Sequence, residues 1–229
     1  MNPPAKASAP LPMGKGIYKR GYLPHWDFTG SLQAITFRLA DSVPSVVIQQ
    51  WQRELANIPD EAAREHELRC RIARYEDTGA GEAILMNPDC AAMVQDKLIK
   101  GNPAQYRLID WCIMTNHVHV LCKLESSATL CDIMRSWKGA SAIEINRLLQ
   151  RSGPLWEREY FDRLVRDLDH LLECRAYIRN NPVKAKLCEQ PEDWPFSAAG
   201  NGWGDDGALA LAGESESSDG EPAQDESAG

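Results

Sequence analysis

Alternating apolar and polar residues predict the extended segments of this chain. Residues Leu32–Leu39 alternate regularly, which predicts a β-strand with one buried face. Two further runs of strand-forming residues, 105–114 and 117–124, are separated by only two residues, which predicts an antiparallel hairpin. The remaining short segments expected to be extended are 83–86 and, as a strand or a loop, 156–165.

Apolar residues spaced three or four positions apart predict helices between and after these strands. The first four predicted helices span 44–58, 61–75, 87–100 and 129–150. Ser42 or Ser45 is a candidate cap for the first, and Pro88 suits the first turn of the third. A fifth helix follows residue 164. We expect Pro182 to end it, because proline lacks an amide hydrogen and disfavours the helical conformation in the residue before it.

Strands mixed with helices, and joined by a hairpin rather than by regular parallel crossovers, predict an α+β fold with an antiparallel sheet. We expect one domain over residues 15–203, with an inserted helical hairpin over about 44–80. The Pro/Ala-rich segment 1–14 is expected to be disordered. The Gly/Ser/Glu-rich segment 204–229 has the composition of a disordered, acidic tail.

Two histidines, His117 and His119, lie in the strand predicted at 117–124. Side chains alternate between the faces of a strand, so both imidazoles point the same way, with Cβ atoms about 7 Å apart. Val118 and Val120 then face the core. Two imidazoles in this arrangement can bind one metal ion. Two polar residues on the exposed face of a half-buried strand give the same pattern, so the motif alone leaves both interpretations open.

A second stretch, at the end of the fifth predicted helix, contains Tyr177 and Asn181. Residues four positions apart share a helix face. A tyrosine phenol can attack phosphorus, and an amide oxygen on the same face can provide a third ligand to a metal. The alternative for Tyr177 is a core aromatic at the edge of the apolar stripe.

Together the two stretches resemble the single-tyrosine HUH transposases, and more closely the REP-associated tyrosine transposases. That family has His-hydrophobic-His on a strand and, on a later helix, a tyrosine followed four residues on by an amide. Further stretches that fit the resemblance run in order through roughly residues 15 to 200: Gly21-Tyr22-Leu23-Pro24-His25, Thr36-Phe37-Arg38, Tyr106-Arg107-Leu108, 156–163, 181–185 and Trp194-Pro195-Phe196-Ser197. Thr115 departs from the proline usual before Asn-His, but it occupies no ligand position.

The resemblance implies a ferredoxin-like antiparallel sheet with helices on one face and the active site on the other. It implies that Tyr177 is the nucleophile and forms a covalent 5′-phosphotyrosine with single-stranded DNA. His117, His119 and Asn181 would be ligands of Mg²⁺ or Mn²⁺. The implied partner is single-stranded or hairpin DNA from palindromic repeats, with no membrane involved. The protein is expected to be a monomer, with a dimer as the alternative.

Charge neither supports nor excludes a DNA partner. The net charge is −8, but the segment after residue 203 holds eight acidic residues and no lysine or arginine, so residues 1–203 are neutral. A neutral body can still have a basic groove, because the local field attracts phosphate. The seven cysteines are scattered and never form a Cys-x-x-Cys pair, which is typical of reduced thiols in a cytoplasmic protein.

Seven basic residues are candidate DNA contacts, although each has a solvated or structural alternative. They are Lys19, Arg20, Arg135, Lys138, Arg163, Arg166 and Lys184. The other histidines, His25, His66 and His170, are interpreted as structural or surface residues.

Three functions are consistent with these motifs. The first is an active single-strand endonuclease and strand-transferase, which accounts for the histidine pair, Tyr177 and Asn181 together. The second is a non-catalytic DNA-binding regulator on the same scaffold, which requires none of these four residues. The third, a metalloenzyme acting on a small molecule, leaves Tyr177 and Asn181 unexplained.

Overall fold

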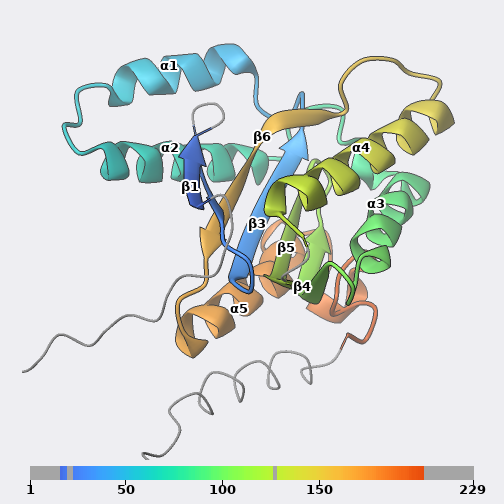
Figure 1. Ribbon diagram of the computed structural model, residues 1–229. Coiled ribbons are helices and arrows are strands. Elements are labelled where there is room, and N and C mark those ends of the chain that lie inside the picture. Colours follow the sequence, from blue (N-terminus) through green and yellow to red (C-terminus); the bar gives the residue numbers. More distant parts are fainter. Residues whose placement is uncertain (1–15, 20–22, 126–127, 204–229) are drawn as a thin grey trace, which may run out of the picture.

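A four-stranded antiparallel sheet organises the chain in the computed structural model, which describes residues 16–19, 23–125 and 128–203 (Figure 1). The strand order is β4-β5-β3-β6. The strands are β3 (Leu32–Leu39), β4 (Tyr106–Ile113), β5 (His117–Leu124) and β6 (Trp156–Leu164). A separate two-stranded sheet pairs β1 (Gly16–Lys19) with β2 (Pro24–Asp27).

Helices connect these strands. They are α1 (Ser45–Leu55), α2 (Glu61–Glu76), α3 (Pro88–Lys100), α4 (Leu130–Leu148) and α5 (Leu168–Lys184), with short 3₁₀ helices η1 (Ile84–Met86) and η2 (Pro191–Asp193). None of the helices in the described ranges combines the length and the apolar character needed to cross a membrane.

The succession β3-α3-β4-β5-α4-β6, with β3 and β5 in the middle of the sheet, is the split βαβ arrangement of ferredoxin-like folds. The predicted α+β class and antiparallel sheet are therefore confirmed. Helices α1 and α2 form a hairpin between β3 and η1, where the sequence predicts an inserted helical hairpin. The predictions for segments 1–14 and 204–229 concern residues outside the described ranges.

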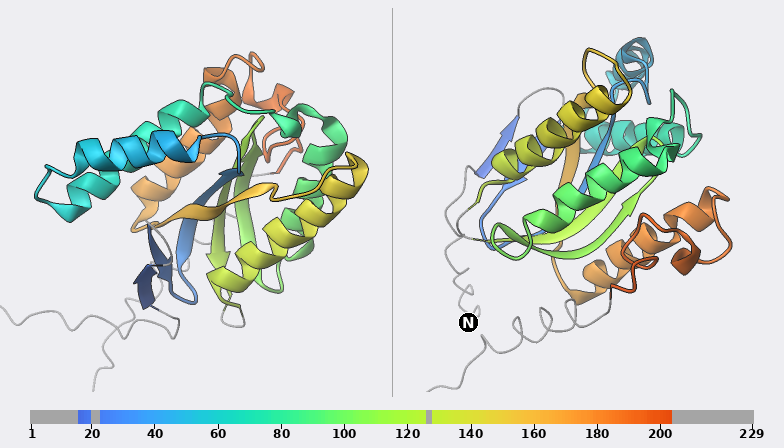
Figure 2. Two further views of the ribbon diagram at one scale, coloured as in Figure 1. Left: turned by 90° about the horizontal axis from the view of Figure 1, so that it is seen from above. Right: turned by 90° about the vertical axis from the view of Figure 1, so that its right-hand side faces the viewer.

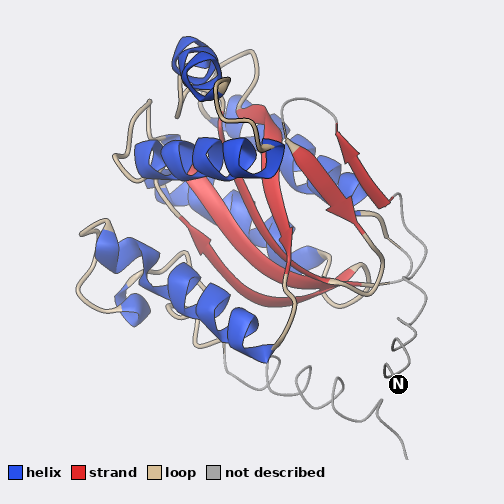
Figure 3. Ribbon diagram, turned by 90° about the vertical axis from the view of Figure 1, so that its left-hand side faces the viewer, coloured by secondary structure: helices blue, strands red, loops and turns tan. Residues whose placement is uncertain are grey.

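Helices lie on both faces of the sheet (Figures 2 and 3). The main core lies under α3 and α4, where residues such as Val94 and Trp137 pack against Val118 and Val120 of β5. A smaller cluster lies on the other face, where Leu171 and Ile178 of α5 pack against the sheet. The predicted helical layer on one face is thus present, and α5 adds a helix on the site face because its apolar stripe covers β4.

The inserted hairpin has a core of its own. Val43, Ile48 and Leu55 pack against Leu68 and Ile72 of α2, and Phe161 of β6 joins this cluster from the main sheet. The hairpin is therefore anchored at β6, at the edge of the face that carries α5.

Two local predictions were wrong. Segment 83–86 is not a strand: Ala83 has a left-handed φ of 49°, and Ile84–Met86 form a 3₁₀ turn held by the Leu85 amide donating to the Thr115 carbonyl. Neither serine caps α1, whose N-cap is Pro44. Ser42 instead donates its hydroxyl to the Leu39 carbonyl.

Pro182 does not end the fifth helix, which continues to Lys184. Proline removes only one helical hydrogen bond, and the last turn is held by other bonds. The Ala185 amide donates to the Asn181 carbonyl, and the Leu187 amide donates to the Pro182 carbonyl. A proline this close to the C-terminus leaves little helix after it to disrupt.

Candidate active site

Strand β5 directs His117 and His119 to the face covered by α5. Val118 and Val120 between and beside them enter the opposite core, as the alternation predicts. The histidines are not on an exposed face, since only 1% of His117 and 5% of His119 is accessible. The interpretation of exposed polar residues on a half-buried strand is therefore wrong, and the buried imidazoles need partners.

His117 is oriented by its neighbour Asn116. The Asn116 Nδ2 donates to the carbonyls of Glu76 and Ala80 at 3.2 and 2.8 Å, and its Oδ1 lies 2.8 Å from His117 Nδ1. Carbonyls only accept, so the amide nitrogen must face them and the oxygen must face the imidazole. His117 Nδ1 therefore has the proton, and its Nε2 presents a lone pair.

His119 is held from the neighbouring strand β3. Its Nδ1 lies 2.8 Å from Thr36 Oγ1, across the register pair that joins Thr36 to His119. Its Nε2 lies 3.0 Å from His117 Nε2. This short distance is a hydrogen bond if His119 Nε2 has the proton. If both Nε2 atoms bind one cation, that proton must move to Nδ1, where the Thr36 hydroxyl can accept it.

Both imidazoles are neutral at physiological pH. Burial lowers the pKa of His119 to about 4, with a further contribution from the positive charge of Lys184. Burial, His119 and Arg38 hold the pKa of His117 well below its ordinary value. Neutral imidazoles have the lone pairs that metal coordination requires.

Helix α5 brings Tyr177 to this histidine pair. The Tyr177 and His119 rings are 5.4 Å apart between centroids and nearly perpendicular, at 78°. Lys184, one to two turns later, places Nζ 5.0 Å from the centroid of the Tyr177 ring. Tyr177 is 40% exposed, so a substrate can reach a side chain that the helix nevertheless holds against the site.

A buried ionic cluster under α5 fixes this position. Asp110 of β4, which is fully buried, lies 3.3 Å from Arg175 Nε and 2.6 Å from Arg179 Nε. These arginines flank Tyr177 by two residues on each side. Arg179 also donates to the Trp203 carbonyl at 3.0 Å, which ties the segment after η2 to the helix.

Asn181 completes the face of α5 that carries Tyr177. Burial raises the pKa of the Tyr177 phenol, while the nearby Asn181 amide lowers it and Asp77 and Glu76 raise it. Asn181 is 2% exposed, and its Nδ2 makes no hydrogen bond of ordinary geometry within the described structure. A buried amide without such a bond is costly unless another group occupies the site.

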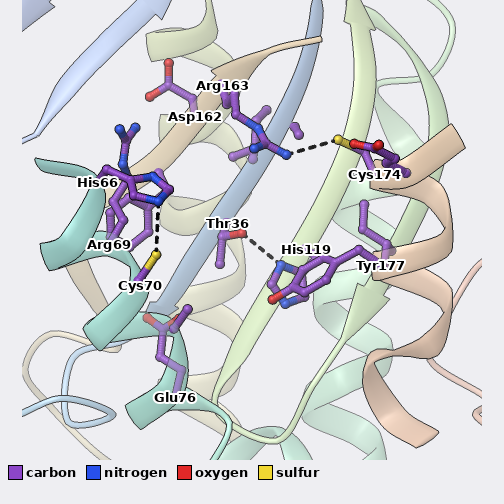
Figure 4. A pocket seen from close by; sticks show the side chains of 16 residues that line it. Thr36, His66, Arg69, Cys70, Glu76, His119, Asp162, Arg163, Cys174 and Tyr177 are labelled. Carbon is purple, nitrogen blue, oxygen red and sulfur yellow. Dashed lines mark hydrogen bonds between the residues drawn. The ribbon is translucent and has the colours of Figure 1, made fainter. Parts of the chain in front are cut away.

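These side chains line a cavity of 470 Å³ between α2, β3, β6 and α5. In Figure 4, Thr36 and His119 lie at its centre and Tyr177 lies on the α5 side. His66, Arg69 and Cys70 of α2 line the other side, and Arg163 of β6 lies at one end. The volume is typical of a pocket that admits a small ligand.

The donor set fits a divalent cation. Two imidazole nitrogens approach one point, and the unpartnered Asn181 amide presents Oδ1 instead of Nδ2 after a simple flip. No group of three His, Cys, Asp or Glu side chains suited to a metal occurs among the described residues, so the third ligand here would be an amide. Such a mixed set of nitrogen and oxygen ligands is compatible with Mn²⁺ and Mg²⁺.

The predicted DNA contacts are divided between two faces of the sheet. Arg163 and Lys184 lie at the site, and Arg166 is exposed between β6 and α5. Arg135 and Lys138 lie on α4, across the sheet. Arg135 binds Asp132 at 2.8 Å, and Lys138 donates to the carbonyls of Glu157 and Arg158.

Two predicted contacts at the N-terminus cannot be placed with the others. Lys19 ends β1, but its side chain is outside the described structure. Arg20 is also outside the described ranges.

The remaining histidines are mostly structural. His25 is fully buried with Nδ1 2.6 Å from Asp162, and His170 accepts the Arg166 amide. His170 is 7% exposed and therefore not the surface histidine expected. His66 is exposed but lines the cavity.

Sequence reasoning missed Thr36, Asn116 and Arg69. Asn116 precedes His117 directly, so adjacency to a candidate ligand was a usable signal. Thr36 and Arg69 gave no comparable signal, because their proximity depends on the pairing of β3 with β5 and on the position of α2.

Comparison with known proteins gives a family for the segment that holds these residues. The model of the IS200-like transposase family matches residues 95–181, which include both histidines of the pair, Tyr177 and Asn181. A Haemophilus influenzae protein named as a REP-associated tyrosine transposase is 29% identical over 97 residues, which are 38% of this chain and 55% of that protein. The chain thus spans about half the length of that curated relative.

Two solved structures are similar at low identity. One is a REP-associated tyrosine transposase bound to a REP hairpin, with 17% identity, a TM-score of 0.46 and coverage of 79% of this chain and 81% of that chain. The other is a protein from Deinococcus radiodurans R1 described as a transposase, with 15% identity, a TM-score of 0.33 and coverage of 72% and 96%.

The family match and the curated relative agree with the motifs. The similarity to the REP-associated tyrosine transposases is therefore confirmed, and over residues 95–181 the chain has the sequence of an IS200-like transposase.

Proposed function

We propose that this chain is a metal-dependent transposase that cleaves and rejoins single-stranded DNA through a covalent bond to Tyr177. The observation that carries the proposal is the meeting of β5 and α5. It places the Tyr177 phenol beside His119, with Asn181 and Lys184 around it in one cavity. A tyrosine selected only for packing would be buried, whereas Tyr177 is 40% exposed.

The bond changes follow from the nucleophile. The Tyr177 oxygen attacks the scissile phosphorus, a new Tyr–O–P bond forms, and the bond from phosphorus to the 3′ oxygen breaks. The phenol gives up its proton and the leaving oxygen takes one, so no net proton is consumed. The 5′-phosphotyrosine retains the energy of the phosphodiester, so attack by a 3′-OH can rejoin strands without another energy source.

The surroundings of Tyr177 suit this role. Burial raises the pKa of the phenol, so its proton must be lost as the attack proceeds. The Asn181 amide and the Lys184 ammonium lie where negative charge develops, and both favour the phenolate. His117, His119 and Asn181 would hold Mg²⁺ or Mn²⁺, which when bound supplies Lewis-acid stabilisation of the phosphate.

The substrate we propose is a single strand next to a hairpin. The curated relative is named for its association with REP, and the motifs of this chain resemble the same group. Bases splayed from a single strand can be read by stacking and by contacts to their edges, without a helix in a duplex groove.

The test uses one hairpin oligonucleotide with a single-stranded flank, labelled at either end. After incubation with Mn²⁺, the 3′-labelled fragment should migrate with the protein on a denaturing gel. The 5′-labelled fragment should be released with an extendable 3′-OH. Retarded but intact DNA would support the non-catalytic regulator, and a free 5′-phosphate without a protein adduct would exclude Tyr177 as the nucleophile.

A further inference from the structure

The α2 helix of the inserted hairpin forms one wall of the cavity that contains Tyr177. Its residues His66, Arg69, Cys70, Ala73 and Glu76 line the cavity and recur at the spacing of one helix face. Its other face supplies the apolar residues that pack against α1. The hairpin is thus not only an appendage, because a complete polar face of α2 is turned towards the site.

Three cations surround the cavity without carboxylate partners in the described structure. Arg69 is on α2, Arg163 on β6 and Lys184 on α5, and none forms an ion pair with Asp or Glu. Arg163 contacts only the thiol of Cys174, at 3.4 Å. Elsewhere on α2, by contrast, Arg71 binds Glu54 and Glu67, and Arg74 lies 3.9 Å from Glu67.

The acidic side chains of the cavity are mostly engaged. Asp162 is taken by His25 and by the Trp26 amide, and Glu76 lies 3.5 Å from buried Arg38. Glu173 is exposed on α5 at the rim. The field inside the cavity therefore favours anions, and the side opposite Tyr177 is provided by α2.

We propose that α2 is a strand-binding wall: Arg69 and Arg163 bind successive backbone phosphates of the single strand that reaches Tyr177. The proposal rests on the proposed function and adds the path of the strand. A cavity of 470 Å³ admits a nucleotide-sized ligand and excludes a duplex, so the ligand is single-stranded. Unpaired arginines on two walls fit a chain of phosphates, which needs separate cationic contacts along its length.

The test measures binding without chemistry. Fluorescence anisotropy of a labelled single-stranded oligonucleotide is recorded in EDTA over a salt series, so neither a metal nor the Tyr177 reaction contributes. Arg69→Gln and Arg163→Gln should each weaken binding about two- to fivefold at low salt. Each should also lower the slope of log K against log salt by about 0.7, the value for one phosphate contact on a single strand.

Matched variants give opposite expectations. Arg74→Gln, on the same helix but 71% exposed and outside the cavity, should leave the slope unchanged. Glu173→Gln should tighten binding, because it removes the acidic charge at the rim. An unchanged slope for Arg69→Gln, or absence of single-strand binding by the unaltered protein, would overturn the strand-binding wall. Cleavage by that same protein with Mn²⁺ would then show that the proposed function survives without it.

A second inference comes from hydrogen bonds at the end of α2. Asn116 is 1% exposed, and its Nδ2 is held by the carbonyls of Glu76 and Ala80, both from the inserted segment. Its Oδ1 then fixes the proton of His117 on Nδ1. We infer that Asn116 is a positioning residue, which keeps the Nε2 lone pair of His117 directed at the proposed cation. Partners that orient a ligand in this way typically change metal affinity about 10- to 100-fold when removed.

The readout for Asn116 does not depend on activity. The ¹⁵N shifts of the imidazoles, measured without metal, should show His117 protonated on Nδ1 in the unaltered protein. Asn116→Ala should give a mixture of tautomers and about 10- to 100-fold weaker Mn²⁺ binding by calorimetry. If the unaltered protein has His117 protonated on Nε2, the inference is wrong whether or not the variant folds. An unchanged tautomer and unchanged metal affinity in Asn116→Ala would exclude it equally.

Discussion

The two faces of the central sheet come from the same strands but have different contents. Under α3 and α4 lies the larger core, with aromatic contacts such as Phe37 on Trp137, 6.1 Å apart, and Phe37 on Trp156, 4.9 Å apart. Under α5 the apolar cluster is smaller, and buried polar groups lie beside it: Asp110, Asn116, His117, His119, Arg175 and Asn181. Strand β5 supplies both faces, with valines on one and histidines on the other.

The difference shows how the stability of one face supports the chemistry of the other. Burial of apolar surface contributes roughly 25 cal/mol per Å², so the α3–α4 face stabilises the fold without polar partners. On the α5 face each buried polar group needs a hydrogen bond or a counter-charge. Asn116 and Asp110 provide several of these, while Asn181 Nδ2 lacks an ordinary one. The position of the deficit is where the proposed cation would bind.

Removal of one oxygen from the α5 face should have the largest effect. Tyr177→Phe should abolish cleavage and the covalent adduct, because only the attacking hydroxyl is lost, and DNA affinity in EDTA should stay nearly unchanged. Denaturing gels and anisotropy measure the two quantities.

Tyr160 provides the comparison for Tyr177. It is 2% exposed, its ring packs on His25 at 4.2 Å, and burial raises its pKa. Tyr160→Phe should therefore still form the adduct. Undiminished cleavage by Tyr177→Phe would place the nucleophile elsewhere.

Loss of an imidazole should remove metal binding. His119→Ala deletes one of three proposed ligands, so Mn²⁺ affinity measured by calorimetry should fall by more than the roughly 10- to 100-fold typical of an outer partner. His66→Ala is the matched control, because His66 lines the same cavity from α2 without touching the pair. Equal Mn²⁺ affinity in a folded His119→Ala protein would remove the histidines from the metal site.

Equal destabilisation of the two faces should have unequal consequences. Trp137→Ala leaves a cavity in the α3–α4 core, and Asp110→Asn leaves two arginines at α5 without their carboxylate; each should cost about 3–5 kcal/mol in urea unfolding. Only Asp110→Asn should also slow cleavage by the folded fraction, since it loosens the helix that carries Tyr177. Equal specific activity of the two variants would show that α5 does not need this cluster.

A titratable ion pair should give the smallest effect. Burial alone lowers the pKa of His25, but hydrogen bonds with Asp162 and Glu159 outweigh it and raise the pKa from 6.5 to about 9. The folded state therefore holds the proton more tightly. The stabilisation is complete below about pH 6.5 and is lost as the pH rises through 9, by about 3 kcal/mol at most. The Asp110 cluster has arginine partners and should not titrate in this range.

The unfolding free energy measured from pH 6 to 10 tests this difference. The unaltered protein should lose stability over that window, and His25→Gln should give a flatter curve. Parallel curves for the two proteins would mean that His25 is neutral in the folded state.

The local pattern of the sequence was sufficient for much of the fold and for the central motif. Alternation predicted β3 with its observed bounds and placed His117 and His119 on one side of β5. Helical spacing put Tyr177 and Asn181 on one face of α5. These features depend on the periodicities of 2.0 and 3.6 residues, which are properties of neighbouring residues along the chain.

Only the tertiary structure decided what surrounds that motif. The burial of the histidine pair, the contact of Thr36 with His119 and the wall formed by α2 depend on strand order and on the packing of a hairpin far away in sequence. The same reason placed Arg135 and Lys138 across the sheet from Tyr177, although their charge alone made them equal candidates to Arg163 and Lys184. A residue's type and spacing determine what it can do, but the pairing of distant segments determines which groups are within its reach.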